Sequence, residues 1–237
     1  MTHPTPIRPP RAGARPRVLD LFCHRGGMAM GYHQAGFDVV GVDLDASCGE
    51  EYPFTFVHGD AIEYLLAHGH EYDLVHGSPP CQKYTPLNAY NHKTYPDLIA
   101  PTRAAMRAVG RPYVIENVEA ARPEMVDPVM LCGPMFGLRM RLFEASFPLV
   151  PPPHPAHVAR CTRNGYLPTL ERPFMTITGG RHSKAWQRAA AEAMGTPWIT
   201  TIRGVCEAIP PAYAKHVGHA ALSMLARVRE VAECAAS

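Results

Sequence analysis

Residues 17–37 read RVLDLFCHRGGMAMGYHQAGF, an apolar run followed by a turn with two adjacent glycines and then a helix-like segment. Glycines at such a turn let the backbone approach a ligand closely, and the helix that follows offers it unpaired N–H groups. The glycine turn alone is not specific. It predicts a strand, a turn and a helix, as at the start of a nucleotide-binding α/β fold.

Two further apolar runs support this prediction because each ends in a carboxylate. The run 38–43 ends in Asp43, about 20 residues after the turn, where dinucleotide-binding folds place an acid on a ribose hydroxyl. The run 54–60 ends in Asp60. The pattern predicts parallel strands whose carboxyl ends form a ligand site.

Residues 77–82 read GSPPCQ, directly after the apolar run 72–76. Two consecutive prolines hold the next residue in a stiff, extended loop, so Cys81 is expected at the mouth of the fold. The alternative is a loop ending in a small, semi-buried thiol. Downstream, 111–118 predicts another buried strand that ends in Glu116 and Asn117, although Glu116 could also be a solvated strand cap.

These motifs together resemble the DNA cytosine-C5 methyltransferases over most of the chain, from about residue 17 to about residue 220. The resemblance rests on four segments in the family's order: Asp20-Leu21-Phe22 with Gly26-Gly27, Pro79-Pro80-Cys81-Gln82, Glu116-Asn117-Val118 and Arg139-Met140-Arg141-Leu142-Phe143. It implies the Rossmann-like fold of S-adenosylmethionine-dependent methyltransferases, an α/β fold with a mostly parallel, doubly wound sheet and a small, reduced target-recognition lobe.

The resemblance also implies catalytic roles. C5 of cytosine is too weak a nucleophile to attack a methyl donor, so Cys81 would add to C6 as a thiolate. Glu116 would supply a proton or hydrogen bond at N3, a role that burial of the carboxyl would favour. Arg141 and Arg139 would hold O2 of the base or order the site. The reaction requires a base that is flipped out of the DNA duplex.

S-adenosylmethionine is the cofactor that the resemblance implies, without a metal. Asp43 would bind the ribose hydroxyls, Asp60 the adenine amino group, and Phe22 would pack against the adenine or the sulfur end. The complete set of expected cofactor-binding residues is Phe22, Gly26, Gly27, Asp43, Asp60 and Pro80.

DNA is the expected partner, with contacts from Gln82, Lys83, Arg163 and Arg181. The polar, aromatic and basic segment 83–95 resembles the mobile loop that closes over a flipped base, with Lys83 and Lys93 near phosphates, although an ordinary solvated loop fits as well. Residues 156–200 contain arginines of the type that read base edges.

Composition sets broader expectations. The 237 residues are 46% hydrophobic, enough for one core, and a net charge of +2 means that DNA affinity must come from a local patch. Seven cysteines without Cys-x-x-Cys spacing, and 13 scattered histidines, predict reduced thiols and no zinc site. Without an 18-residue apolar stretch or signal peptide, we expect a monomer in the cytoplasm of a bacterial or phage-infected cell, with no membrane contact.

The expected organisation has four parts. Residues 1–16 form a basic, proline-rich tail expected to be disordered, and 17–148 a catalytic and cofactor-binding domain. Residues 149–200 form the target-recognition region behind a proline-rich linker, and 201–237 contain a helix, from 212 to 231, that returns to the catalytic domain.

Three positions depart from the family pattern. His24 replaces a glycine, Gly137 replaces a glutamine, and Cys206-Glu207 replaces Gly-Asn. Because His24 and Arg25 could crowd the methionine part of the cofactor, an alternative is a catalytically weakened or inactive DNA-binding protein on the same scaffold. A nicotinamide-dependent dehydrogenase would explain the glycines and Asp43 but gives Cys81 and Glu116 no role. An RNA substrate is also compatible with the sequence.

Overall fold

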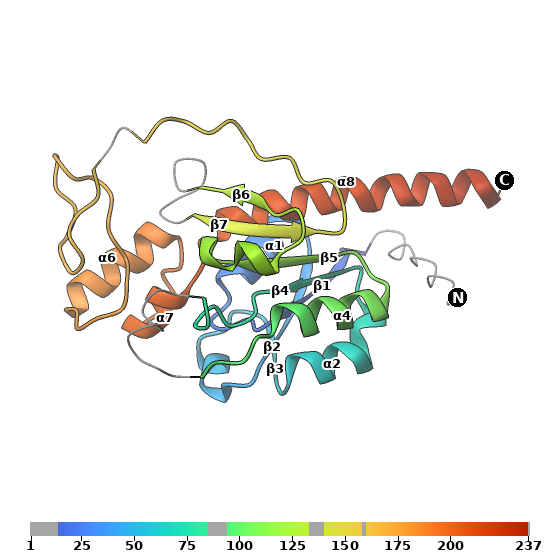
Figure 1. The fold of residues 1–237 in the computed structure, drawn as a ribbon, viewed down its shortest axis with the longest axis horizontal. Helices are drawn as coiled ribbons and strands as arrows, with labels where there is room; N and C mark the ends of the chain where they lie inside the picture. Colours follow the sequence, from blue (N-terminus) through green and yellow to red (C-terminus); the bar gives the residue numbers. More distant parts are fainter. Residues whose placement is uncertain (1–13, 85–93, 133–139, 158–159, 237) are drawn as a thin grey trace.

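A seven-stranded sheet organises the protein, as the computed structural model shows for residues 14–84, 94–132, 140–157 and 160–236 (Figure 1). The strand order is β3-β2-β1-β4-β5-β7-β6. The strands are β1 (Arg17–Leu21), β2 (Asp38–Asp43), β3 (Thr55–His58), β4 (Leu74–Gly77), β5 (Tyr113–Asn117), β6 (Val129–Leu131) and β7 (Arg141–Ala145).

Strands β1 to β5 are parallel, whereas β7 runs antiparallel to its neighbours β5 and β6. The strand order reverses between β1 and β4, and ligands bind at such a switch point, beyond the carboxyl ends of the strands. The predicted α/β fold with a mostly parallel, doubly wound sheet is confirmed.

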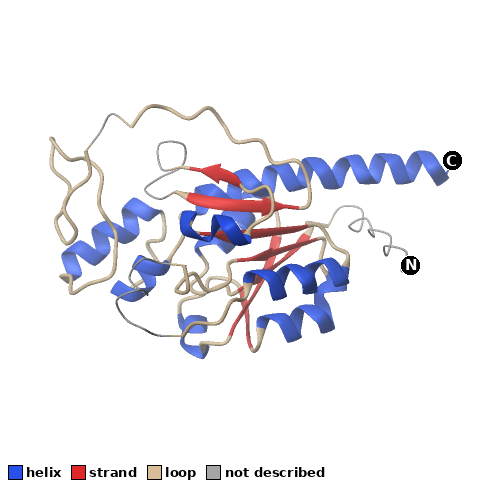
Figure 2. Ribbon diagram, in the orientation of Figure 1, coloured by secondary structure: helices blue, strands red, loops and turns tan. Residues whose placement is uncertain are grey.

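Helices cover both faces of this sheet (Figure 2). One apolar cluster joins the sheet to α1 and α8, through Tyr32 and Tyr213, and a second joins it to α2 and α4, through Leu65 and Met106. The helices are α1 (Gly27–Ala35), α2 (Ala61–His68), α4 (Ile99–Val109), α6 (Lys184–Met194), α7 (Ile202–Glu207) and α8 (Pro211–Ala236), with short 3-10 turns η1 (Ala46–Glu50), η2 (Gly69–Glu71) and η3 (Glu119–Glu124).

A smaller lobe has its own apolar cluster, centred on Trp186 and Met194 of α6 and Val205 of α7. It is reached through residues 148–157, a mostly exposed, proline-rich segment that we call the strap and that crosses the top of Figure 1 in yellow. Trp198 donates to the carbonyl of Arg25 at 2.9 Å, so the lobe is attached beside the glycine turn. The apolar cluster of the lobe includes residues on both sides of position 200, where a boundary was predicted. The predicted division of the chain into four parts stays a prediction. Most of the predicted N-terminal tail, residues 1–13, lies outside the described residues.

The expected C-terminal helix is present and longer than predicted, because α8 starts at Pro211 and continues to Ala236. A proline suits the first turn of a helix, where its missing N–H costs nothing. Within the described part of the chain, none of the helices is both long and apolar enough to cross a membrane.

Close packing of α1 against the start of α8 predicts which glycines matter for stability. A Cβ at Gly31 would lie 2.1 Å from the carbonyl oxygen of Pro211, whereas a Cβ at Gly59 would meet nothing within 4 Å. We expect Gly31→Ala to lower the free energy of unfolding by about 1–3 kcal/mol, despite the better helix propensity of alanine. Chemical denaturation measures this, with Gly59→Ala as the matched control. Equal stability of the two variants would contradict the packing argument.

Candidate active site

A cavity of about 470 Å³ lies at the carboxyl ends of the central strands. Its volume falls within the usual range of small-molecule sites. Among its lining residues are nine that the sequence singles out: Phe22, Gly27, Asp43, Asp60, Pro80, Cys81, Gln82, Glu116 and Arg141. The fold thus brings most of the expected catalytic and cofactor-binding residues to one space.

The turn after β1 has an unusual backbone. Phe22, His24 and Gly26 all have left-handed conformations, with φ of 56°, 46° and 79°. Such a φ favours glycine and costs other residues about 1–3 kcal/mol. At His24 two contacts offset this cost: its N–H donates to Asp43 Oδ2 at 2.9 Å, and its Nε2 lies 3.0 Å from Glu207 Oε2.

Two of the departures from the family pattern therefore contact each other. His24 and Glu207 both line the cavity, whereas Arg25 is not among the lining residues and pairs with Glu51 at 2.8 Å. Burial tends to raise the pKa of Glu207, but hydrogen bonds and charges from His24 and Arg203 outweigh it and lower that pKa. Glu207 is thus a carboxylate in the cavity wall, paired with the histidine that replaces the glycine.

The two carboxylates expected to bind the cofactor are held by backbone N–H groups. Asp43, the last residue of β2, accepts from His24 and, through its other oxygen, from Asp45 at 2.9 Å. Asp60 caps α2 and accepts from Ile62 and Glu63 through Oδ1 alone. Both side chains are fixed at the cavity before any ligand binds.

Gly26, by contrast, does not line the cavity. A Cβ there would lie 2.7 Å from Cδ of Pro53, so the close contact at this glycine is with packed protein. Gly27 lines the cavity, but its Cβ would also clash, 2.2 Å from the carbonyl oxygen of Ile209. The glycines of this turn therefore allow close packing of the chain.

Asn117 fixes the loop that carries Cys81. Its side-chain Nδ2 donates to the carbonyl of Pro79 at 2.9 Å, and its Oδ1 accepts from the N–H of Val118 at 2.9 Å. Sequence reasoning gave Asn117 no role of its own; its place in Glu-Asn-Val was the available signal.

Burial and the nearby Glu116 raise the pKa of the Cys81 thiol, an effect that Arg141 partly offsets.

Glu116 and Arg141 form a mostly buried ion pair, with Arg141 Nε 2.9 Å from Glu116 Oε1. Their side chains are 4% and 13% exposed. The antiparallel register of β5 and β7 causes this contact, because it sets Asn117 opposite Leu142, next to Arg141. Arg139, Lys93 and Gly137 lie outside the described residues.

A buried polar network that the sequence analysis missed lies beside the cavity. His76 of β4 is bracketed by the Tyr32 hydroxyl, 3.0 Å from Nδ1, and the Ser78 hydroxyl, 3.0 Å from Nε2. Burial lowers the pKa of His76 to about 3, so the ring is neutral. A histidine within the apolar run 72–76 was the signal, and Ser78 connects this network to the cavity.

The expected DNA-binding residues are divided between two places. Gln82 lines the cavity, and the neighbouring Lys83 forms an ion pair with Asp97. Arg163 and Arg181 are exposed on the smaller lobe and are not among the cavity residues. Their contacts with DNA stay predictions.

Asp20 is a buried carboxyl in the cavity wall. Burial above all, with Asp43 and Glu116 nearby, raises the pKa of Asp20 to about 8, although Tyr52 donates a hydrogen bond to it at 3.3 Å. Between about pH 4 and pH 8 the folded protein therefore keeps a proton that the unfolded chain releases.

This proton predicts a pH dependence of stability. The stability that this bound proton gives the folded state is fully present below about pH 4 and is lost as the pH rises toward 8. The Asp20→Asn variant has no such proton, so its stability does not fall for this reason. We expect the stability of Asp20→Asn relative to the parent to increase from pH 5 to pH 8, as measured by denaturant unfolding. Glu230→Gln, on the exposed end of α8, is the control. A difference that does not change with pH would refute the assignment.

Comparisons with known proteins agree with the motifs. The type II methyltransferase M.HgiDI of Herpetosiphon aurantiacus is 27% identical over 89% of this chain and 79% of its own length. The type II methyltransferase M.XorII of Xanthomonas oryzae is 30% identical over 44% of this chain and 28% of its own length. No protein-family model matches the chain.

Solved structures match over nearly the whole chain. The Entamoeba histolytica methyltransferase EhMeth aligns with 90% of this chain and 99% of its own, at a TM-score of 0.58 and 10% identity. The S. pombe Dnmt2 methyltransferase aligns with 90% of this chain and 98% of its own, at 0.55 and 14%. These two likenesses concern the fold. Together with the sequence matches they agree with the resemblance: the chain is similar to type II methyltransferases and has the Rossmann-like fold of S-adenosylmethionine-dependent methyltransferases.

Proposed function

We propose that this protein transfers a methyl group from S-adenosylmethionine to C5 of cytosine in DNA. One observation carries the proposal: Cys81, Glu116 and Arg141, from three separate segments, line the same cavity as Asp43 and Asp60. A thiol, a carboxyl and a guanidinium are the groups that this reaction requires at the base. The two carboxylates suit the hydroxyl and amino groups of a nucleoside.

The cavity residues fit S-adenosylmethionine. Asp43 would accept hydrogen bonds from the ribose hydroxyls, and Asp60, which caps α2 through Oδ1 alone, would accept one from the adenine amino group. Phe22 and Pro80 offer apolar surface, and Glu207 adds a carboxylate that suits a positively charged ligand. The cofactor supplies an activated methyl group on a sulfonium.

The chain's own residues would act on the base. Cys81 adds to C6 as a thiolate, which forms an S–C6 bond and makes C5 nucleophilic. Glu116, once it has taken up a proton, donates a hydrogen bond to N3, and Arg141 beside it contacts O2. After the methyl group reaches C5, loss of the C5 proton expels Cys81 and restores the ring.

The raised pKa of Cys81 fits a nucleophile that is activated only in the complex. In the free protein burial and Glu116 favour the thiol. A cation close to the sulfur favours the thiolate. Binding of the positively charged methyl donor would therefore increase the fraction of Cys81 that is thiolate. Cys81 would then be reactive in the complex that also contains the flipped base.

The base must leave the duplex to reach this cavity, at a cost of a few kcal/mol. Lys83, Arg163 and Arg181 are exposed or partly exposed cations that would grip phosphates while the base is flipped. Since Lys83 pairs with Asp97 in the free protein, its contact with DNA would require that ion pair to open.

The proposal predicts that methyl transfer depends on Cys81. Labelled S-adenosylmethionine and cytosine-containing duplex DNA should give 5-methylcytosine with the parent. Cys81→Ala should give none, because it removes the thiol that is proposed to add to C6. Cys161→Ala, which removes an exposed cysteine outside the cavity, is the matched control.

Nucleoside analysis of the product and a direct binding measurement with S-adenosylmethionine separate the alternatives. Activity that survives in Cys81→Ala would refute the covalent mechanism. If the parent binds DNA but neither binds the cofactor nor transfers methyl groups, the alternative of an inactive DNA-binding protein is supported. His24 is then the first residue to replace, because it could crowd the cofactor. Methylation of RNA alone would change the substrate.

The contact between Asn117 and Pro79 predicts a positioning role. Asn117→Asp replaces the donating amide with an oxygen that repels the Pro79 carbonyl, so the Cys81 loop should shift. A displacement of about 1 Å can cost roughly 10²-fold in rate. We expect kcat to fall by that order while the KM for S-adenosylmethionine stays unchanged. Asn164→Asp, in the lobe, is the control; an unchanged kcat, or an equal rise in KM, would contradict the role.

A further inference from the structure

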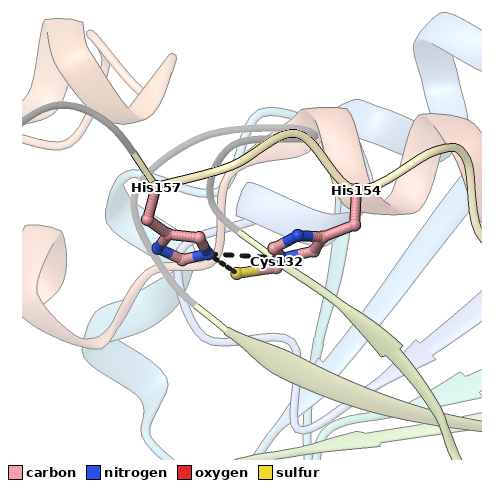
Figure 3. Close-up of side chains that lie close together, drawn as sticks. All are labelled: Cys132, His154 and His157. Atoms are coloured by element: carbon pink, nitrogen blue, oxygen red, sulfur yellow. Dashed lines mark hydrogen bonds between the residues drawn. The ribbon is translucent and has the colours of Figure 1, made fainter.

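Three side chains with metal-binding atoms meet on the side of the sheet where the strap crosses it (Figure 3). Cys132 directly follows β6, whereas His154 and His157 belong to the strap. Cys132 Sγ lies 3.4 Å from His157 Nε2, which lies 3.3 Å from His154 Nε2. All three atoms are within 4.8 Å of one another.

These distances match the spacing of ligands around a tetrahedral zinc ion. With Zn–N of 2.0–2.1 Å and Zn–S of about 2.3 Å, a tetrahedron separates two nitrogens by about 3.4 Å and a nitrogen from a sulfur by about 3.6 Å. The observed separations of 3.3 and 3.4 Å are close to both values. Two of the three pairs are therefore already at ligand spacing, and the third pair lies within 4.8 Å.

Hydrogen bonding alone satisfies this arrangement poorly. Nε2 of His157 faces both the sulfur of Cys132 and Nε2 of His154. A ring nitrogen offers either one proton or one lone pair, so it cannot serve both neighbours fully. A cation between the three atoms would use a lone pair from each.

We propose that Cys132, His154 and His157 bind a divalent transition metal, with zinc as the best chemical match. A thiolate with two imidazoles is a donor set that zinc favours, and three protein ligands leave one position to water. The sequence predicts no metal site, because the cysteines lack paired spacing. The ligands become neighbours only when the strap crosses the sheet edge.

A metal here would join two parts of the molecule. The strap leads from β7 to the smaller lobe, and Cys132 is a buried residue beside the edge strand β6. Elsewhere the strap is held by Leu149, which is buried in the apolar cluster of α1 and α8, and by the hydrogen bond from His216 of α8 to the Val150 carbonyl, at 2.9 Å. The ion would therefore fix the second half of the strap, next to the lobe.

Metal titration of the full-length, reduced protein tests this proposal. We expect one Co²⁺ per chain, with the absorption of a thiolate-to-cobalt charge transfer, and displacement of the Co²⁺ by Zn²⁺. His154→Ala and His157→Ala change exposed residues, so folding should survive. Each histidine variant should weaken metal binding by more than about 10–100-fold, the loss that is typical when a residue that only supports a ligand is changed. Cys132→Ser should lose the charge-transfer band.

Matched controls remove one exposed histidine or cysteine elsewhere, with His219→Ala and Cys161→Ser. Both should bind like the parent. Zn²⁺ should also raise the melting midpoint of the parent and of the controls but not of His157→Ala, because the metal binds only the folded site. Absence of stoichiometric binding, or unchanged affinity in both strap variants, would overturn the proposal.

Discussion

The antiparallel pairing of β7 with β5 is the constraint on which the rest of the site depends. This pairing places Arg141 beside the carboxyl end of β5, and there it meets Glu116. The same strand is anchored from the other side, since Glu144 accepts two hydrogen bonds of 2.6 Å from Arg103 of α4. Removal of one partner of such a buried pair would leave a charge without compensation. The strand that carries the arginine is therefore held in one register.

Carboxyl groups concentrate at the cavity, and the backbone around them is arranged accordingly. Asp20, Asp43, Glu116 and Glu207 all line the wall, and two of them accept hydrogen bonds from main-chain or side-chain groups of the glycine turn. Burial above all, with the nearby Asp43 and Glu116, raises the pKa of Asp20 to about 8 and keeps it protonated near neutral pH. A site of this kind gains most when its ligand carries positive charge, because the ligand relieves the mutual repulsion of the carboxylates.

Local patterns in the sequence were enough to predict much of the fold and of the site. The apolar runs with polar ends predicted β1 to β5, and the resemblance brought Cys81, Glu116 and Arg141 together. The sequence did not predict β6 and β7 as strands, because their pairing is long-range and β6 has only three residues. The contact between His24 and Glu207 could not be predicted from the sequence, where the two residues are separate departures from the family pattern. They meet only because the fold places α7 against the glycine turn.

The cavity wall is built from segments that lie far apart in the sequence. Phe22 directly follows β1 and Asp43 ends β2, whereas Arg203, Glu207 and Ile209 come from the segment before α8. During synthesis on the ribosome the sheet through β7 can emerge while this last part of the wall is still missing. The ligand site is therefore finished only when the segment up to Ile209 has been translated. A truncated product that ended in the strap would retain Cys81 and Glu116 but lack that wall.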